Sequence, residues 1–225
     1  MEDRFVHDEL PQGIYDAYNE FIFSKDSKLL HKLFSKQFFV NLTKDVPGDI
    51  VELGVFKGSG FVAWLKVCRL EHVKRKVYGF DYFDAEKLVS GINTTDRSLM
   101  ASLFTSRDFE SKGYEHVLER ITQDIGFTNF ALLAGDVFST VPDFLAQNPG
   151  FRASIINFDL DTAEPTIFAL NQFWDRLVPG GVLIFDEYAI NEWTESDAVD
   201  EFIRSKGLRL KYTNIDAPTA YLIRD

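Results

Sequence analysis

Four apolar runs of this chain each end in an acidic residue, and this pattern constrains the fold more than any other feature. The runs end at Glu52, at Asp81, at Asp159 and at the pair Asp186 and Glu187. Short β-rich runs separated by helical stretches predict a parallel sheet with helices on both faces. Parallel sheets place their sites at the carboxyl ends of the strands, so we expect these acids to converge on one crevice. Converging carboxylates repel one another unless hydroxyls, a cation or raised pKa values compensate, which points to bound ligands.

Length and composition indicate a single domain and limit the partners. The chain has 225 residues, which predicts one domain over 1–225 with a full core. Its net charge is -11, so we expect neither nucleic acid nor an anionic membrane as a partner. No apolar stretch approaches the roughly 20 residues of a membrane span, and the N-terminus lacks the apolar core of a signal peptide. The single cysteine, Cys68, is expected to be buried in a helix. One cysteine cannot form an internal disulfide, which fits a reducing compartment, so the chain is predicted to be cytoplasmic.

Two segments are expected to surround the site. Residues 1–46 predict a helical cap over one side of the site or an oligomer interface, and their Phe-rich helices make a homodimer an expectation. Residues 84–125 are irregular, and we interpret them as a lid that selects the substrate.

The remaining elements alternate as in an α/β domain. Strands are expected at 49–54, 76–81, 130–136, 154–159 and 181–186, and helices at 59–71, 164–177 and 196–206. A further helix is expected to open at Val141 with Pro142 in its first turn. The last helix is expected to be capped by Ser196 or Asp197 and to stop at Gly207. Alternation near the C-terminus predicts an antiparallel edge hairpin that completes a seven-stranded sheet.

The first expected strand leads into a glycine-rich loop. Its glycines, Gly54, Gly58 and Gly60, miss the spacing of the dinucleotide fingerprint, and the loop lacks the phosphate-binding Walker motif. Glu52, two residues before the first glycine, suits a cationic ligand without phosphates, such as S-adenosylmethionine. The alternative is a tight strand-to-helix turn that binds nothing.

Two further strand ends are candidates for the rest of that cofactor. An acid at Asp81 can accept hydrogen bonds from both ribose hydroxyls, and Gly135 with Asp136 can meet the adenine edge. Ordinary turn roles are the alternative for each of them. The predicted cofactor-binding residues are Glu52, Gly54, Val55, Gly58, Ser59, Asp81, Tyr82, Gly135, Asp136 and Val137.

The downstream acids form a candidate metal site. Asp159, Asp186 and Glu187 come from two strand ends, and three carboxylates make a hard-oxygen site suited to Mg²⁺. The metal would polarise a substrate hydroxyl, and Asp159 or Asp161 would accept its proton. We interpret Asp161 as the cap of the following helix, and His116 as a weaker candidate for the base.

These motifs together resemble the macrocin O-methyltransferase family. The likeness lies in residues 46–59, 79–83, 159–161 with Thr166, and 177–188, and it runs from about residue 46 to the C-terminus. It implies a Rossmann-like class I methyltransferase fold and S-adenosylmethionine- and Mg²⁺-dependent methylation of sugar hydroxyls, often in antibiotic biosynthesis.

By position, the resemblance implies that Asp159 is a metal ligand and the general base, and that Asp186 and Glu187 are the paired metal-binding acids. The family usually has Asp where this chain has Glu187, and often Gly where it has Leu160. We therefore expect an O-methyltransferase for a sugar or glycosylated natural product, of the deoxysugar 3-O type. The alternatives are a methyltransferase for a catechol-like or other non-sugar acceptor, and a nucleotide-binding protein without turnover.

Overall fold

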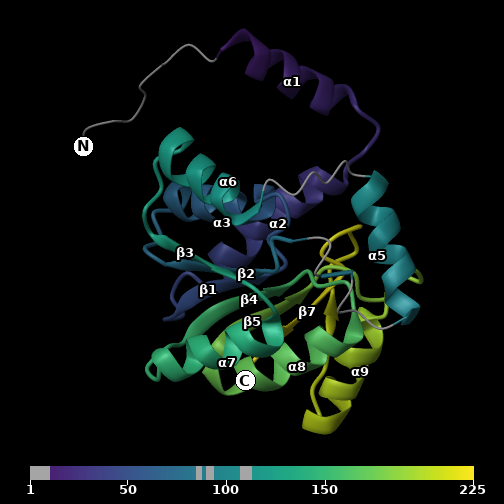
Figure 1. Ribbon diagram of the computed structural model, residues 1–225. Helices are drawn as coiled ribbons and strands as arrows, with labels where there is room; N and C mark the ends of the chain where they lie inside the picture. The colour runs from purple at the N-terminus through teal and green to yellow at the C-terminus, as the bar shows by residue number, and fades with distance from the viewer. Residues whose placement is uncertain (1–10, 85–87, 90–93, 107–112) are drawn as a thin grey trace.

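A seven-stranded sheet forms the centre of the molecule (Figure 1). The computed structural model describes residues 11–84, 88–89, 94–106 and 113–225. The strands are β1 (Asp49–Leu53), β2 (Val77–Asp81), β3 (Phe130–Ala134), β4 (Ala153–Phe158), β5 (Leu177–Phe185), β6 (Lys211–Tyr212) and β7 (Ala220–Ile223). Their order is β3-β2-β1-β4-β5-β7-β6, and only the pairs that involve β7 are antiparallel. This confirms the predicted parallel sheet with an antiparallel edge hairpin.

Helices cover both faces of the sheet, as Figure 1 shows. The described helices are α1 (Gln12–Phe23), α2 (Lys28–Leu42), α3 (Ser59–Leu70), α5 (Thr94–Ser106), α6 (Gly113–Glu119), α7 (Val137–Gln147), α8 (Ala163–Phe173) and α9 (Glu195–Lys206), with a π-helical turn at Arg120–Asp124 and a 3₁₀ turn at Trp174–Arg176. α2, α3 and α6 lie on one face, and α7, α8 and α9 on the other.

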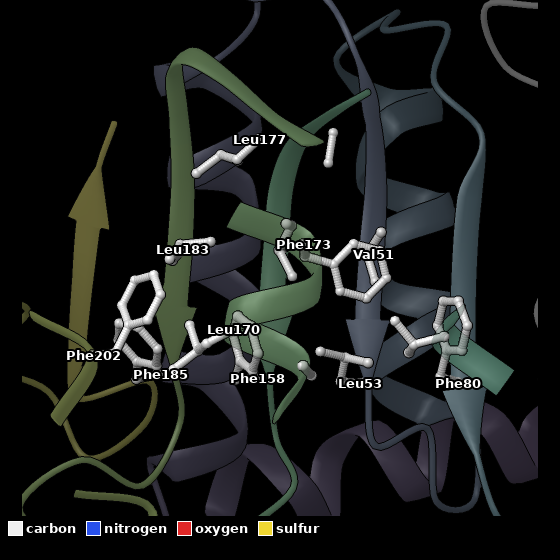
Figure 2. Close-up of a cluster of buried hydrophobic side chains, with 14 of the residues drawn as sticks. Val51, Leu53, Phe80, Phe158, Leu170, Phe173, Leu177, Leu183, Phe185 and Phe202 are labelled. Atoms are coloured by element: carbon white, nitrogen blue, oxygen red, sulfur yellow. The ribbon is translucent and has the colours of Figure 1, made fainter. Parts of the chain in front are cut away.

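Alternation along each strand divides the apolar side chains between two cores. Figure 2 shows the core under α8 and α9, where Leu53, Phe158 and Phe185 of the strands pack with Phe173 and Phe202 of the helices. Because side chains of a strand alternate between faces, the even-numbered residues of β1 point the other way, toward α2 and α3. Glu52 therefore points to the side of α2, and it is only 1% exposed.

The cap and the lid are described in part. α1 has no buried residue, and Figure 1 shows it set apart from the two helix layers. Its exposed apolar side chains are Ile14, Tyr15, Tyr18, Ile22 and Phe23. The homodimer expected from these helices stays a prediction. Within the predicted lid, α5, α6 and the π-helical turn are described, and residues 85–87, 90–93 and 107–112 lie outside the described ranges.

Three local expectations are wrong. Helix α7 begins at Val137, because Asp136 caps it through a hydrogen bond from Phe138 N, so Pro142 lies inside the helix rather than in its first turn. Strand β5 begins at Leu177 rather than at residue 181, and its register with β4 is irregular over the Pro-Gly-Gly run. The N-cap position of α9 is occupied by Thr194 rather than by Ser196 or Asp197.

Two simpler expectations are confirmed. Cys68 is buried in α3, and Gly207 ends α9 in the left-handed conformation. Among the described residues, no helix is long and apolar enough to cross a membrane.

Gly79 gives a test of the packing between β2 and the α3 side of the sheet. A Cβ at Gly79 would lie 2.7 Å from side-chain atoms of both Phe61 and Val55. We expect Gly79→Ala to lower the free energy of unfolding by about 1–3 kcal/mol in denaturant titrations, because the core must shift to admit the methyl group. Gly150→Ala, where no atom lies within 4 Å of the added Cβ, is the control and should be close to neutral. Equal stability of the two variants would contradict this packing.

Candidate active site

The cavity of this molecule lies at the point where the connections of the parallel sheet change direction. β1 and β4 are neighbours; the chain leaves β1 for α3 on one face and leaves β4 for α8 on the other. Open α/β sheets bind ligands at such a switch point. A cavity of about 500 Å³ opens there, which is the size of a small-molecule site.

Most of the predicted site residues line this cavity. Those that do are Glu52, Gly54, Val55, Ser59, Asp81, Tyr82, Gly135, Asp136, Val137, Asp159 and Glu187. Gly58 and Asp186 are not among the lining residues. Gly58 precedes α3 in the left-handed conformation, and a Cβ there would lie 2.9 Å from Val117, so its backbone and its packing both favour glycine; its cofactor contact stays a prediction. His116 of α6, the weaker candidate for a base, does not line the cavity either.

Asp81 holds the glycine-rich loop in place. Its Oδ2 accepts hydrogen bonds from Val55 N at 2.8 Å and Phe56 N at 2.7 Å, and its Oδ1 accepts one from Phe83 N at 2.7 Å. Burial raises its pKa, although these three N–H groups act in the opposite direction. The side chain predicted to bind ribose thus has a second task, which is to fix the loop that leaves β1.

Gly54 brings the loop after β1 into contact with the loop after β4. A Cβ at Gly54 would lie 2.0 Å from the carbonyl oxygen of Asp159, and the glycine has a φ of +93°. Asp159 N donates to Leu53 O at 2.9 Å, which continues the ladder between β1 and β4 past the strand ends. Only glycine permits this approach of the two loops.

Glu52 is a buried acid that points toward α2. Its Oε1 lies 3.4 Å from Lys36 Nζ, and the same ammonium stacks over Trp64 at 4.5 Å. Among the described residues, Glu52 Oε2 has no hydrogen-bond partner. Burial raises the pKa of Glu52 to about 7, although Lys36 acts to lower it. The cavity thus contains an acceptor that a cationic ligand group could satisfy.

The adenine-edge candidates serve structural roles as well. Asp136 Oδ1 accepts from Phe138 N at 3.0 Å as the cap of α7, and Tyr82 OH lies 3.3 Å from Asp136 Oδ2. Gly135 has a φ of +132°, so the turn into α7 favours glycine there. Gly135 and Asp136 therefore have the turn roles that were the alternative to a cofactor contact. Both residues also line the cavity.

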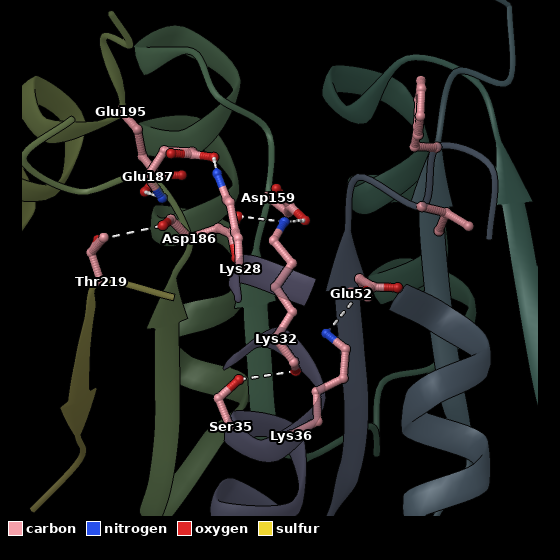
Figure 3. A network of polar contacts seen from close by, with 12 residues as sticks. Lys28, Lys32, Ser35, Lys36, Glu52, Asp159, Asp186, Glu187, Glu195 and Thr219 are labelled. Carbon is pink, nitrogen blue, oxygen red and sulfur yellow. Dashed lines mark hydrogen bonds and ion pairs between the residues drawn. The ribbon is translucent and has the colours of Figure 1, made fainter. Parts of the chain in front are cut away.

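Lysines of α2 pair with every acid that was predicted to bind metal (Figure 3). Lys32 Nζ lies 2.6 Å from Asp186 Oδ2 and 3.3 Å from Asp159 Oδ2. Lys28 Nζ lies 2.8 Å from Glu187 Oε1. Burial alone would lower the pKa of Lys32, but the charges of Asp159 and Asp186 outweigh it and raise that pKa.

Asp161 and Glu195 enlarge the acid cluster. The expectation that Asp161 caps the next helix is wrong, because α8 follows Thr162 and Asp161 lines the cavity with a φ of +64°. Burial, followed by the charge of Asp159, raises its pKa well above the usual range. Glu195 is fully buried; its Oε1 accepts from Glu187 N at 3.1 Å, and burial likewise raises its pKa well above the usual range.

As they stand, these acids do not fit a divalent cation. Within the described ranges, no group of three or more His, Cys, Asp or Glu side chains is arranged to hold a metal ion. Carboxylate oxygens that such an ion would need already face the ammonium groups of Lys28 and Lys32. The predicted magnesium site is therefore not supported by this arrangement, and magnesium dependence stays a prediction.

The α2 lysines and Glu195 are the site residues that the sequence reasoning missed. Lys28, Lys32 and Lys36 recur at four-residue intervals, which places them on one face of a helix. That spacing was visible in the sequence of the predicted cap. Glu195 gave no such signal, because its burial depends on the packing of α9 against α8.

Fold and cavity define a class I methyltransferase, and comparisons with known proteins agree. The solved structure of CalS11, described as a TDP-rhamnose 3'-O-methyltransferase of calicheamicin biosynthesis, has a TM-score of 0.69 at 25% identity, covering 96% of this chain and 87% of that one. The O-methyltransferase NovP has a TM-score of 0.68 at 23% identity, covering 85% and 78%, which supports the fold.

Sequence comparison then gives the family. The profile of the macrocin-O-methyltransferase (TylF) family matches residues 34–224. An 8-demethyl-8-(2,3-dimethoxy-alpha-L-rhamnosyl)-tetracenomycin-C 4'-O-methyltransferase of Streptomyces olivaceus is 31% identical over 83% of this chain and 70% of that protein. A mycinamicin III 3''-O-methyltransferase of Micromonospora griseorubida is 26% identical over 80% of this chain and 70% of that protein. The chain belongs to the macrocin-O-methyltransferase family and is an O-methyltransferase.

Burial of Glu52 predicts a specific dependence of stability on pH. Its pKa rises from 4.5 to about 7 in the folded chain, so the native state binds an extra proton between these values. The stability that this proton contributes is complete below about pH 4.5 and is lost as the pH rises through 7. We expect the stability of the wild type relative to Glu52→Gln to fall by about 3 kcal/mol over this range in denaturant titrations.

The matched control is Glu201→Gln, which removes a carboxylate from the exposed side of α9. The stability of the wild type relative to this variant should change little over the same pH range. A flat difference for Glu52→Gln would contradict the buried setting of Glu52.

Proposed function

We propose that this chain transfers the methyl group of S-adenosylmethionine to a hydroxyl of a sugar or a glycosylated natural product. The single observation that carries the proposal is the cavity at the β1–β4 switch point, which has Glu52 and Asp81 on one side and Asp159 on the other. The relatives are named as O-methyltransferases of a rhamnosyl-tetracenomycin, of mycinamicin III and of TDP-rhamnose, and the two rhamnose names support a sugar as acceptor.

On this proposal, the cofactor lies against the loop after β1. Glu52 Oε2, buried and without a partner among the described residues, would accept from the amino group of the methionine part. The cavity-lining oxygens of Asp81 would face the ribose, and residues 135–137 the adenine edge. When bound, the cofactor supplies an electrophilic methyl group on a sulfonium, and the chain supplies position and charge.

Asp159 is the residue that we propose as general base. It lines the cavity from the end of β4, and its backbone is in contact with the loop at Gly54. It would accept the proton of the acceptor hydroxyl as the oxygen attacks the methyl carbon and the sulfur leaves with the electron pair of the broken bond. Fixing the two loops against each other aligns oxygen, carbon and sulfur, and orientation of this kind accounts for a large share of the rate in such displacements.

A non-sugar acceptor is the second candidate. The cavity mixes apolar residues such as Phe56, Met100 and Trp193 with charged ones, and a catechol would also find apolar contacts there. A screen of nucleotide sugars, glycosides and catechols with labelled cofactor separates the two, because only one acceptor class should become labelled.

Binding of S-adenosylmethionine should depend on pH through Glu52. The cationic cofactor favours the ionised carboxylate, whereas the free protein holds Glu52 at a pKa of about 7. We expect affinity measured by calorimetry to rise about tenfold between pH 6 and pH 8, because below the pKa binding must release a proton. In Glu52→Gln this dependence should disappear. No binding of the cofactor by the wild type would reject the proposed function.

Asp159→Asn tests the base. Loss of a general base typically lowers turnover by about 10²–10⁴-fold, and we expect kcat to fall by about that factor. Cofactor affinity should change little, because Asp159 is assigned to the acceptor. Asp143→Asn, on the exposed side of α7, is the control and should retain full turnover. Unchanged turnover in Asp159→Asn would show that the base lies elsewhere.

A further inference from the structure

One face of α2 carries three lysines that end in the acid cluster, as Figure 3 shows. Lys36 contacts Glu52 on the cofactor side, and Lys28 contacts Glu187 at the far end. Lys32 lies between them and bridges Asp159 and Asp186, which follow two neighbouring strands.

Lys32 lies where a shared cation would have to lie. An ion bound by Asp159 and Asp186 needs oxygens of both carboxylates within its coordination shell, and the Lys32 ammonium lies 3.3 and 2.6 Å from one oxygen of each. A divalent ion among these oxygens would therefore sit directly beside a half-buried ammonium. The two positive charges would repel each other at this short distance.

Lys28 and Lys32 also lie outside the part of the chain that the family profile matches, which begins at residue 34. The matched range includes Asp159, Asp186 and Glu187 but not the two lysines that pair with them.

We propose that Lys32 takes the place of a divalent cation in this enzyme. It acts as a positioning residue: its ammonium holds Asp159 beside Asp186 and balances their charge, so that Asp159 can accept the hydroxyl proton without a metal ion. This inference rests on the proposed methyl transfer. In that step the O–H bond and the bond from sulfur to methyl break, the bond from oxygen to methyl forms, and Lys32 neither gains nor loses a proton.

Metal binding tests this directly, and it needs neither cofactor nor acceptor. The full chain is titrated with Mn²⁺, monitored by calorimetry and by the spin signal of the free ion. We expect no saturable binding to the wild type, and one Mn²⁺ bound by Lys32→Met, because the carboxylates then lack their ammonium. Lys32→Arg keeps the charge and should exclude Mn²⁺. Lys66→Met removes an exposed lysine of α3 and should behave as the wild type does.

Two results would overturn the proposal. Saturable Mn²⁺ binding by the wild type at these acids, abolished in Asp186→Asn, would mean that Lys32 does not replace the ion. Absence of binding in the wild type, Lys32→Met and Lys32→Gln alike would mean that Lys32 does not stand at a cation site. Lys32→Gln guards against misfolding of the methionine variant, and thermal melting reports whether each variant is folded.

Turnover adds a second readout once an acceptor is found. The wild type should be insensitive to excess EDTA, whereas Lys32→Met should lose about 100-fold in kcat and recover part of it with added Mg²⁺. Wild-type turnover that EDTA abolishes and Mg²⁺ restores would overturn the role of Lys32. Failure to bind S-adenosylmethionine or to methylate any acceptor would instead reject the proposed function, and the Mn²⁺ titration would still decide on Lys32.

Discussion

Charge balance at the carboxyl ends of the strands is the constraint on which the rest of this structure depends. A parallel sheet that ends several strands in acids brings like charges together, and burial makes the ionised forms costly. One helix, α2, supplies the compensating positive charge. Its lysines form ion pairs with Glu52, Asp159, Asp186 and Glu187. The lysines compensate these charges only in part, because burial and neighbouring negative charge raise the pKa of both Glu52 and Asp186 to about 7.

Much of the fold and of the cavity could be predicted from sequence, because both depend on local patterns. The two-residue period and the acids that follow each apolar run indicate where strands end. The sheet, and the position of Asp159 at a strand end, could therefore be predicted. The glycine spacing after β1 also pointed to the loop, although the reason for Gly54, its contact with the Asp159 carbonyl, is visible only in three dimensions.

What could not be predicted depends on how elements pack. Asp161 precedes a helix and therefore matches a cap by sequence, yet its left-handed backbone leaves Thr162 at the start of α8 and leaves Asp161 at the cavity. Pro142 is usual in a first turn, but the capping bond of Asp136 sets the start of α7 earlier. The lysines of α2 were countable in the sequence, but their partners lie more than a hundred residues away for Lys28 and Lys32.

The contact between Gly54 and Asp159 has a consequence for how this enzyme could acquire new acceptors. Because the two backbones touch, the distance between the proposed cofactor site and Asp159, the proposed base, cannot be altered by moving one loop alone. A change of acceptor must therefore come from the surrounding walls, such as Met100 of α5 and Trp193, which line the cavity outside the two loops. On the proposed roles, the catalytic geometry is fixed by the backbone, and substrate scope can diverge around it without renewed optimisation of the chemical step.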